Sequence, residues 1–292
     1  MRDVTGKTAF ITGGASGIGL AMAQAFGAAG MSVMLADIEE AALAEAVRGL
    51  EERQIRAAGV LCDVAHRAAL QAAAEKTLET FGKVHVVCNN AGVGAGGPVG
   101  EVAAADWDWV MEVNLMGVVY GMETFLPHLR AHGEGGYVVN TASMAGLISP
   151  PGMEPYCASK YAVVALSEGW GAQLAPENIG VGVLCPGFVK TRIDQSRRNR
   201  PDRFGGPDAP ENLVASEFVQ GGIDPARVGG RVLEAIRNDE RYIFTHPGMR
   251  AAVQDRFARI MTGFDQADAS PALQGLEEPV FPVGGMAPAK GT

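Results

Sequence analysis

The sequence predicts an α/β protein with a doubly wound parallel sheet of about seven strands and helices on both faces. Short apolar segments alternate with longer segments of helical periodicity almost throughout the chain, which favours a parallel sheet covered on both sides. The length of 292 residues, 47% of them hydrophobic, provides enough material for one large core. We find no internal repeat and no interdomain linker, so we expect a single domain with a C-terminal extension.

The elements follow in order along the chain. We expect strands near residues 7–12, 32–37, 56–62, 84–89, 135–141, 179–185 and 241–244, and helices near 17–29, 39–53, 66–81, 104–131, 155–176 and 224–238. One more amphipathic helix is expected over 247–264, with Val253, Phe257, Ile260 and Met261 on its apolar face. The predicted domain thus covers 1–264, and an Ala/Pro/Gly-rich tail that is loose or laid over a neighbour covers 265–292.

A glycine-rich turn joins the first strand to the first helix, in the run Gly13-Gly14-Ala15-Ser16-Gly17-Ile18-Gly19. A strand, glycine turn, helix and second strand form the context of dinucleotide binding in a Rossmann-type fold. Gly13 permits a tight turn, and Gly17 lets the backbone approach a pyrophosphate held by the helix N-terminus. Gly19 allows close packing of the helix, although the glycine spacing differs from the common Gly-x-Gly-x-x-Gly pattern.

Asp37 ends the second strand, about twenty residues beyond the glycines. A carboxylate there accepts hydrogen bonds from a ribose 2′-hydroxyl and repels a 2′-phosphate. Neither Ser16 nor Ile38 supplies a cation for such a phosphate, so we expect NAD rather than NADP. The alternative is that Asp37 caps the following helix, and both roles are compatible.

Tyr156 and Lys160 end the run Tyr-Cys-Ala-Ser-Lys, and four residues are about one helical turn, so both side chains share a face. An ammonium about 5 Å from a phenol, at an effective dielectric of about 20, favours the phenolate by about 3 kcal/mol. The reference pKa of tyrosine is about 10, so this shift moves the phenol towards the range used in acid–base catalysis. The alternative for an isolated pair is an ordinary helix turn.

These features, with several others, resemble the short-chain dehydrogenase/reductase family from about Lys7 to Phe244. The resemblance is carried by Thr12-Gly13-x-x-x-Gly17-x-Gly19, Cys62-Asp63-Val64, Asn89-Asn90-Ala91-Gly92, the set Asn114, Ser143, Tyr156 and Lys160, and Pro186-Gly187-Phe188-Val189-Lys190-Thr191. It is nearest to the NAD-dependent secondary-alcohol dehydrogenase type. The resemblance implies a catalytic tetrad of Asn114, Ser143, Tyr156 and Lys160.

The resemblance also implies roles for the tetrad. Tyr156 would exchange the hydroxyl proton of the substrate, and Ser143 would orient the same oxygen. Lys160 would hold the nicotinamide ribose and, together with the cationic nicotinamide ring, lower the pKa of Tyr156. Asn114, within a long helix, would anchor a water that links Lys160 to solvent. The cofactor-binding residues it implies are Gly13, Ser16, Gly17, Ile18, Gly19, Asp37, Ile38, Asp63, Val64, Asn90, Ala91, Gly92, Tyr156, Lys160, Pro186, Gly187, Val189 and Thr191. Structural alternatives are turn capping by Ser143 and Thr191 and helix capping or kinking by Asn114.

Composition excludes several other classes of protein. The net charge of −9 argues against a nucleic-acid partner. Cys62, Cys88, Cys157 and Cys185 form no close pairs, as expected of buried thiols in a reduced, cytoplasmic protein. The histidines lack ligand spacing, so we expect no metal. The first strand starts almost at once and no apolar run is long enough for a bilayer, so we expect neither a signal peptide nor a membrane span.

Substrate selection is expected in the loops around 94–97 and 144–155 and in a lid near residues 188–222. Met144, Leu147, Ile148 and Met153 either face an apolar substrate or pack beneath the loops. The lid arginines, which are Arg192, Arg197, Arg198, Arg200 and Arg203, either form a solvated surface, which we favour, or bind an anionic substrate group.

We therefore expect an oxidoreductase that interconverts a hydrophobic secondary alcohol, aryl or alicyclic, and its ketone with NAD. The alternatives are a 3-oxoacyl-thioester reductase acting on a carrier protein or coenzyme A, and a catalytically silent NAD-binding sensor or scaffold. By analogy with the family we expect a homotetramer or homodimer.

Overall fold

The computed structural model describes residues 1–207 and 213–277. Its contacts divide the chain into two units, Met1–Thr245 and a second that begins at His246. The first unit is the predicted doubly wound α/β fold, with one seven-stranded parallel sheet in the order β3-β2-β1-β4-β5-β6-β7. The predicted fold class is therefore confirmed.

All seven strands lie within a few residues of their predicted positions. They are β1 (Thr8–Thr12), β2 (Ser32–Asp37), β3 (Ala57–Leu61), β4 (Val86–Asn89), β5 (Gly136–Thr141), β6 (Ile179–Cys185) and β7 (Tyr242–Phe244). β2 and β3 are added on one side of β1, and the later strands are added on its other side, beginning with β4. β1 pairs with β4 from Ala9 opposite Val86 to Ile11 opposite Cys88, so the order of the strands reverses at this point. In such sheets the ligand crevice lies beyond the carboxyl ends of the strands at this point.

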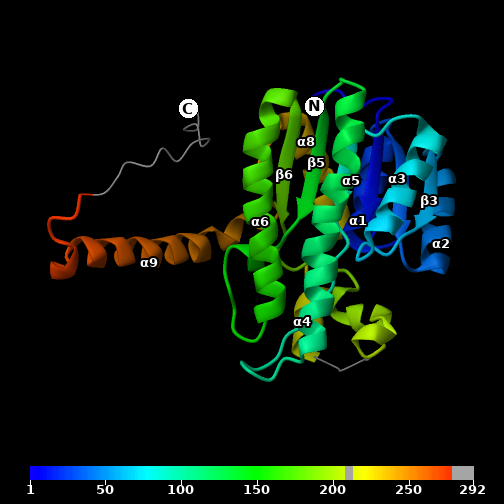
Figure 1. Ribbon diagram of the computed structural model, residues 1–292. Coiled ribbons are helices and arrows are strands. Elements are labelled where there is room, and N and C mark those ends of the chain that lie inside the picture. Colours follow the sequence, from blue (N-terminus) through cyan, green and yellow to red (C-terminus); the bar gives the residue numbers. More distant parts are fainter. Residues whose placement is uncertain (208–212, 278–292) are drawn as a thin grey trace. The chain divides into compact units, whose positions relative to one another are not determined.

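Helices cover both faces of the sheet (Figure 1). The bounds are α1 (Gly17–Ala28), α2 (Glu40–Glu51), α3 (Arg67–Phe81), α4 (Ala104–Met111), α5 (Gly117–Ala131), α6 (Glu154–Leu174), α7 (Leu213–Gln220) and α8 (Pro225–Asn238). Buried residues of α1, α2 and α8 form one hydrophobic cluster with the sheet, and those of α3, α5 and α6 form the other.

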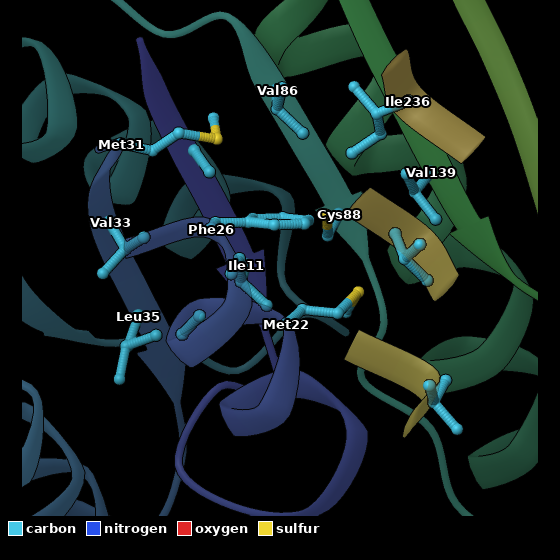
Figure 2. Packing of buried hydrophobic residues seen from close by; sticks show 14 of the residues in the cluster. Ile11, Met22, Phe26, Met31, Val33, Leu35, Val86, Cys88, Val139 and Ile236 are labelled. Atoms are coloured by element: carbon cyan, nitrogen blue, oxygen red, sulfur yellow. The ribbon is translucent and has the colours of Figure 1, made fainter. Parts of the chain in front are cut away.

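The central strand β1 contributes alternate side chains to these two clusters. Figure 2 shows Ile11 among the residues on the α1 side, with Phe26 of α1 lying beside Cys88 of β4. Phe10 points to the other face, where its ring centroid lies 4.3 Å from that of Phe125 in α5. Burial on both faces explains why this strand is apolar at successive positions.

The helix predicted over 104–131 is present, but it is not α-helical throughout. A π-helical turn, Glu112–Met116, separates α4 from α5. The helix predicted over 247–264 is α9 (Arg250–Asp268), which extends into the start of the predicted tail. The part of the lid at 208–212 and the tail from 278 onward lie outside the described residues. Within the described ranges, no helix has both the length and the apolar character needed to cross a bilayer.

Candidate active site

The carboxyl ends of β1, β4 and β5 are joined by side-chain hydrogen bonds. The hydroxyl of Thr12 accepts the backbone N–H groups of Asn90 (2.8 Å) and Ala91 (3.0 Å). The Asn90 amide donates to the Thr12 carbonyl (3.0 Å) and its oxygen accepts from the hydroxyl of Thr141 (3.2 Å). The predicted cofactor-binding residue Asn90 thus fixes the three strand ends that border the crevice.

The glycine turn is shaped as the sequence predicts. Gly13 has a φ of +61°, and a Cβ on Gly19 would lie only 2.1 Å from the Gly13 carbonyl oxygen, so a side chain at either position would distort the turn. A cavity of about 620 Å³ lies at the start of α1, and Ser16, Gly17 and Thr191 are among the residues that line it. Backbone N–H groups at a helix start favour an anion such as a pyrophosphate there.

Asp37 connects the glycine turn to the end of β2. Its Oδ2 accepts the N–H of Ala15 (3.0 Å), and its Oδ1 accepts those of Ile38 (2.8 Å) and Glu39 (3.1 Å). The helix α2 begins after Glu39, so Asp37 closes a turn ahead of the helix rather than occupying the N-cap position. Oδ2 accepts only one N–H, so its second lone pair leaves capacity for a ribose hydroxyl.

Tyr156 and Lys160 lie together at the start of α6. The Lys160 Nζ lies 5.6 Å from the centroid of the Tyr156 ring and donates to the carbonyl of Thr141 (2.9 Å). Lys160 is 2% exposed, and burial lowers its pKa to about 8. The predicted one-turn spacing of the pair is therefore present in the folded chain.

The expected effect of Lys160 on Tyr156 does not appear in the protein alone. Burial raises the pKa of Tyr156 above its usual value, and a hydrogen bond with Ser143 opposes that rise. Desolvation of the phenolate is thus the largest effect on the pKa of Tyr156 in the cofactor-free protein. Lys160 carries the same desolvation cost, which is why its own pKa falls.

Asn114 lies at the middle of the π-helical turn and is fully buried. Its Oδ1 accepts the N–H of Val93 (2.8 Å), and its Nδ2 donates to the Val93 carbonyl (2.9 Å) and to the Ser159 hydroxyl (3.2 Å). A Cβ built on Gly92 would lie 3.4 Å from both Asn114 Oδ1 and Lys160 Nζ, so these two atoms border the same small space. The π-turn is a known feature of functional sites, and the periodicity of the sequence did not indicate it.

Ser143 follows β5 and also caps a turn, which was the structural alternative for this residue. Its hydroxyl accepts the N–H of Ala145 (3.1 Å), which caps the short 3-10 turn at Met144–Gly146, and lies 3.4 Å from the Pro186 carbonyl oxygen. Pro186 also accepts the N–H of Met144 (2.9 Å). The segment that begins at Pro186 is therefore attached to the loop that carries Ser143.

The remaining predicted cofactor residues border the same crevice. Asp63 closes a turn through Ala65, Val64 is buried against Gly117, and Val189 bridges to Ile223. Thr191 lies against Gly17, where a Cβ would come 3.0 Å from its Cγ2, and its Oγ1 accepts the N–H of Ile193 (3.4 Å). Ile18 lies in the first turn of α1, and the others lie in the loops after β2, β4 and β6, which hold Ile38, Ala91, Gly92 and Gly187.

The lid arginines all pair with carboxylates of the protein. Arg198 and Arg192 (3.5 Å) contact Glu39, Arg197 (2.8 Å) and Arg200 (3.0 Å) contact Asp106, and Arg203 lies 3.3 Å from Glu112 and 3.8 Å from Asp63. The favoured interpretation of a solvated arginine surface is wrong for Arg200, which is 8% exposed beside an Asp106 that is 7% exposed. Nothing in the sequence pattern singled out Glu39 or Asp106 as partners.

These contacts hold the lid across the crevice. Glu39 lies just beyond β2, on the side of the predicted ribose site. On the other side Ser196 accepts the N–H of Gly94 (3.0 Å), and Asp106 belongs to α4. The lid therefore contacts both borders of the crevice in the protein alone.

The predicted substrate loops also meet. Gly97 donates its N–H to the Gly152 carbonyl (2.9 Å), which joins the loop after β4 to the loop before α6. Met144 and Leu147 are buried, which favours packing beneath the loop, whereas Met153 is 38% exposed. Phe188 and Phe218 stack with ring centroids 5.2 Å apart and both stay exposed, so the lid itself offers an apolar surface that the sequence analysis missed.

A second polar cluster lies at the opposite ends of the strands, where His85, His132 and Glu134 place ligand atoms within 4.8 Å of one another. The Nδ1 of His85 accepts the N–H of Thr8 (3.1 Å), and the Nδ1 of His132 accepts that of Glu134 (3.1 Å). The other nitrogens lie 3.2 Å from Glu134 and 2.8 Å from the Val84 carbonyl, where each donates in the neutral tautomer. Both imidazole lone pairs are thus occupied, which assigns this cluster a role in joining strands.

A doubly wound sheet with a glycine turn, and with serine, tyrosine and lysine side chains beside the crevice, is the arrangement of a dinucleotide-dependent oxidoreductase. Residues 7–202 match the family model described as short chain dehydrogenase. The chain belongs to the short-chain dehydrogenase family, and the predicted family and enzyme class are confirmed.

Individual relatives agree with this assignment. The chain is 34% identical to the C alpha-dehydrogenase of Sphingobium sp. (strain NBRC 103272 / SYK-6), over 93% of this chain and 90% of that protein. It is similar to a short chain dehydrogenase/reductase from Burkholderia phymatum in complex with NAD, with a TM-score of 0.86 and 40% identity over 96% of this chain and 100% of that one. It also resembles the 3-ketoacyl-(acyl-carrier-protein) reductase from Brucella melitensis complexed with NADH, with a TM-score of 0.70 and 25% identity over 83% of this chain and 97% of that one.

Proposed function

We propose that the protein interconverts hydrophobic secondary alcohols and their ketones with NAD, and that Tyr156 is the general acid–base. The observation that carries the proposal is the contact group formed by Tyr156, Lys160 and Ser143 beside the crevice. An aryl or alicyclic alcohol is the preferred substrate class. The likeness to a C alpha-dehydrogenase and the exposed aromatic pair of Phe188 and Phe218 on the lid support it.

The residues around the crevice fit NAD as the cofactor. The cavity lined by Ser16, Gly17 and Thr191 suits a pyrophosphate, and the Asp37 carboxylate suits a ribose 2′-hydroxyl. The likeness to an enzyme in complex with NAD supports the same choice. When bound, NAD accepts or supplies the hydride that the reaction transfers.

The side chains of the protein then handle the proton. Tyr156 takes the hydroxyl proton of the alcohol, or returns it to the ketone oxygen, and Ser143 holds the same oxygen in place. With a pKa of about 8, Lys160 is mostly a cation at neutral pH, so it favours the phenolate when Tyr156 gives up its proton. Asn114 positions the Val93 loop and the Ser159 hydroxyl beside Lys160.

The rival activity, reduction of a 3-oxoacyl thioester, has the likeness to a 3-ketoacyl reductase in its favour. Its other support was the lid arginines, which would bind phosphate groups of a carrier. Those arginines contact Glu39, Asp106, Asp63 and Glu112 instead, so the alcohol is the better proposal. A catalytically silent NAD-binding sensor would not require the contact group of Tyr156, Lys160 and Ser143, which argues against that alternative. The four buried, unpaired cysteines fit a cytoplasmic location.

The direct test is the NADH absorbance of the purified protein with NAD or NADP and matched aliphatic, alicyclic, aryl and 3-hydroxyacyl-thioester substrates. We expect NADH formation with the alicyclic or aryl alcohols. Turnover confined to thioesters would replace the proposal with its rival, and NAD binding without any turnover would favour the sensor.

Cofactor choice is tested by exchanging Asp37 for Ser together with Ile38 for Arg. This change removes the charge that repels a 2′-phosphate and adds a cation, so we expect the ratio of kcat/KM for NADP over NAD to rise at least about tenfold. Asp108→Ser, which removes an exposed carboxylate on α4, is the matched control. An unchanged ratio would mean that Asp37 serves only the turn through Ala15.

A further inference from the structure

The second unit of the chain presents an apolar surface on α9. Phe257, Ile260, Met261 and Phe264 are 51%, 40%, 57% and 66% exposed. Their spacing of three, four and seven residues places them on one face of the helix. Within the second unit no residue of α9 is buried, so this unit by itself covers no apolar face of the helix. Isolated helices of this length are marginal in water, which indicates that a partner covers this face.

The arrangement of this face is symmetric along the helix. Phe257 precedes Ile260 by three residues, and Phe264 follows Met261 by three, so the centre lies between Ile260 and Met261. If two copies of the helix lie antiparallel about this centre, Phe257 meets the Phe264 of the second copy and Ile260 meets its Met261. A parallel pair would instead place each residue opposite itself.

The charges on the same face favour the antiparallel arrangement. On the same face Arg250 lies about 10.5 positions before the centre and Asp268 about 7.5 positions after it, so in an antiparallel pair they are offset by three residues, or about 4.5 Å along the axis. In an antiparallel pair the basic start of each helix approaches the acidic end of the other, twice by symmetry. In a parallel pair arginine would approach arginine and aspartate would approach aspartate, which is unfavourable.

We propose that α9 is a self-association surface that pairs antiparallel with the α9 of a second copy of this chain, centred between Ile260 and Met261. A pair of helices alone covers less than the roughly 800 Å² per partner of a standard interface. Leu273 and Leu276, which are 47% and 62% exposed, follow α9 in the same unit and add exposed apolar area to it. The proposal does not depend on the proposed activity.

Disulfide mapping in the full-length protein tests the register. A cysteine at position 261 lies next to the cysteine at position 261 of the second chain, and the same holds for position 260. Mild oxidation of Met261→Cys or of Ile260→Cys should therefore link most chains into dimers. Phe257→Cys alone should not link, because its copy is about 10 Å away along the axis. Phe257→Cys combined with Phe264→Cys should link again. Arg259→Cys on the opposite face is the matched control, and wild type reports any linking through the natural cysteines.

The strength of the pairing is tested by sedimentation of Phe257→Asp with Phe264→Asp. Self-association through this surface should weaken at least about 100-fold, with the NAD affinity unchanged because both residues are exposed on the second unit. The helical circular dichroism should fall by no more than the loss of the unpaired α9, since the helix is marginal without its partner. Efficient linking of Phe257→Cys alone would indicate parallel or random contact and overturn the proposal. An unchanged assembly in the double Asp variant, or no linking at Met261, would also overturn it and leave a different protein or the chain's own first unit as the occupant.

Discussion

The catalytic group and the lid border the same crevice but are held by different forces. Around Tyr156 the fixed contacts are buried hydrogen bonds between uncharged groups, such as those of Asn114 with Val93, with Lys160 as the single buried cation. The lid is held by arginine–carboxylate pairs that range from buried, at Asp106, to half-exposed, at Glu39. The catalytic residues therefore lie on a scaffold held by uncharged contacts, whereas the closed position of the lid depends on charge and so on salt and pH.

The largest effect in the catalytic group is expected for Tyr156→Phe. Loss of the phenol proton should lower kcat by at least about 10²–10⁴, which is the usual contribution of general acid–base catalysis. The Kd for NAD, measured by fluorescence, should stay the same because the ring remains. Tyr161→Phe, on the same helix, serves as the control. Substantial turnover by the Tyr156→Phe variant would assign the proton to another group and remove the basis of the mechanism.

The lid is tested most severely at its buried pair. Asp106→Asn leaves Arg200 buried without its counter-charge, a change that costs about 3–5 kcal/mol in buried pairs. We expect faster hydrogen exchange over residues 193–204 and a fall in kcat/KM. Asp108→Asn, exposed on the same helix, should change neither. If hydrogen exchange in the lid stays as slow as in wild type, the ion pairs at Asp106 do not hold the lid.

The buried lysine predicts a pH dependence of stability. The pKa of Lys160 is about 8 in the folded protein against 10.5 for the ordinary side chain, so the unfolded chain binds more protons between these values. Relative to Lys160→Met, the free energy of unfolding of the cofactor-free wild type should therefore rise as the pH increases from about 8 to 10.5. Urea unfolding at both ends of this range measures it, with the exposed Lys190→Met as control. A parallel pH profile for wild type and Lys160→Met would contradict the lowered pKa.

The smallest expected effect is at Glu39, which is half-exposed. Glu39→Gln removes the partner of Arg192 and Arg198 at the lid border next to Asp37. We expect NADP to be accepted up to about fivefold better, since exposed pairs contribute about 1 kcal/mol or less and the arginines become available to a 2′-phosphate. The effect should fade at high salt. Glu40→Gln is the control, and an equal gain in that variant would exclude a specific role for Glu39.

The catalytic region could be predicted from the sequence better than the lid. The strands, the glycine turn and the Tyr156–Lys160 spacing are local patterns, and all of them are present. The partners of the lid arginines could not be found, because Glu39 and Asp106 lie far from them in the sequence and surface-type charges carry no periodicity. The raised pKa of Tyr156 in the cofactor-free protein could not be predicted from the motif, because burial depends on the whole fold.

The π-turn at Asn114 has a consequence for the helices on either side of it. A turn wider than an α-helical one changes the rotational phase of everything that follows, since each α-helical residue advances by about 100°. The buried positions of α4 and α5 therefore do not lie on one uninterrupted 3.6-residue repeat, and Trp109 and Phe125 face their neighbours only because the extra width lies between them. Glu112–Met116 thus accommodates about one residue more than an α-helical turn, and a one-residue deletion there would allow a regular α-helical turn and change which residue stands at the position of Asn114.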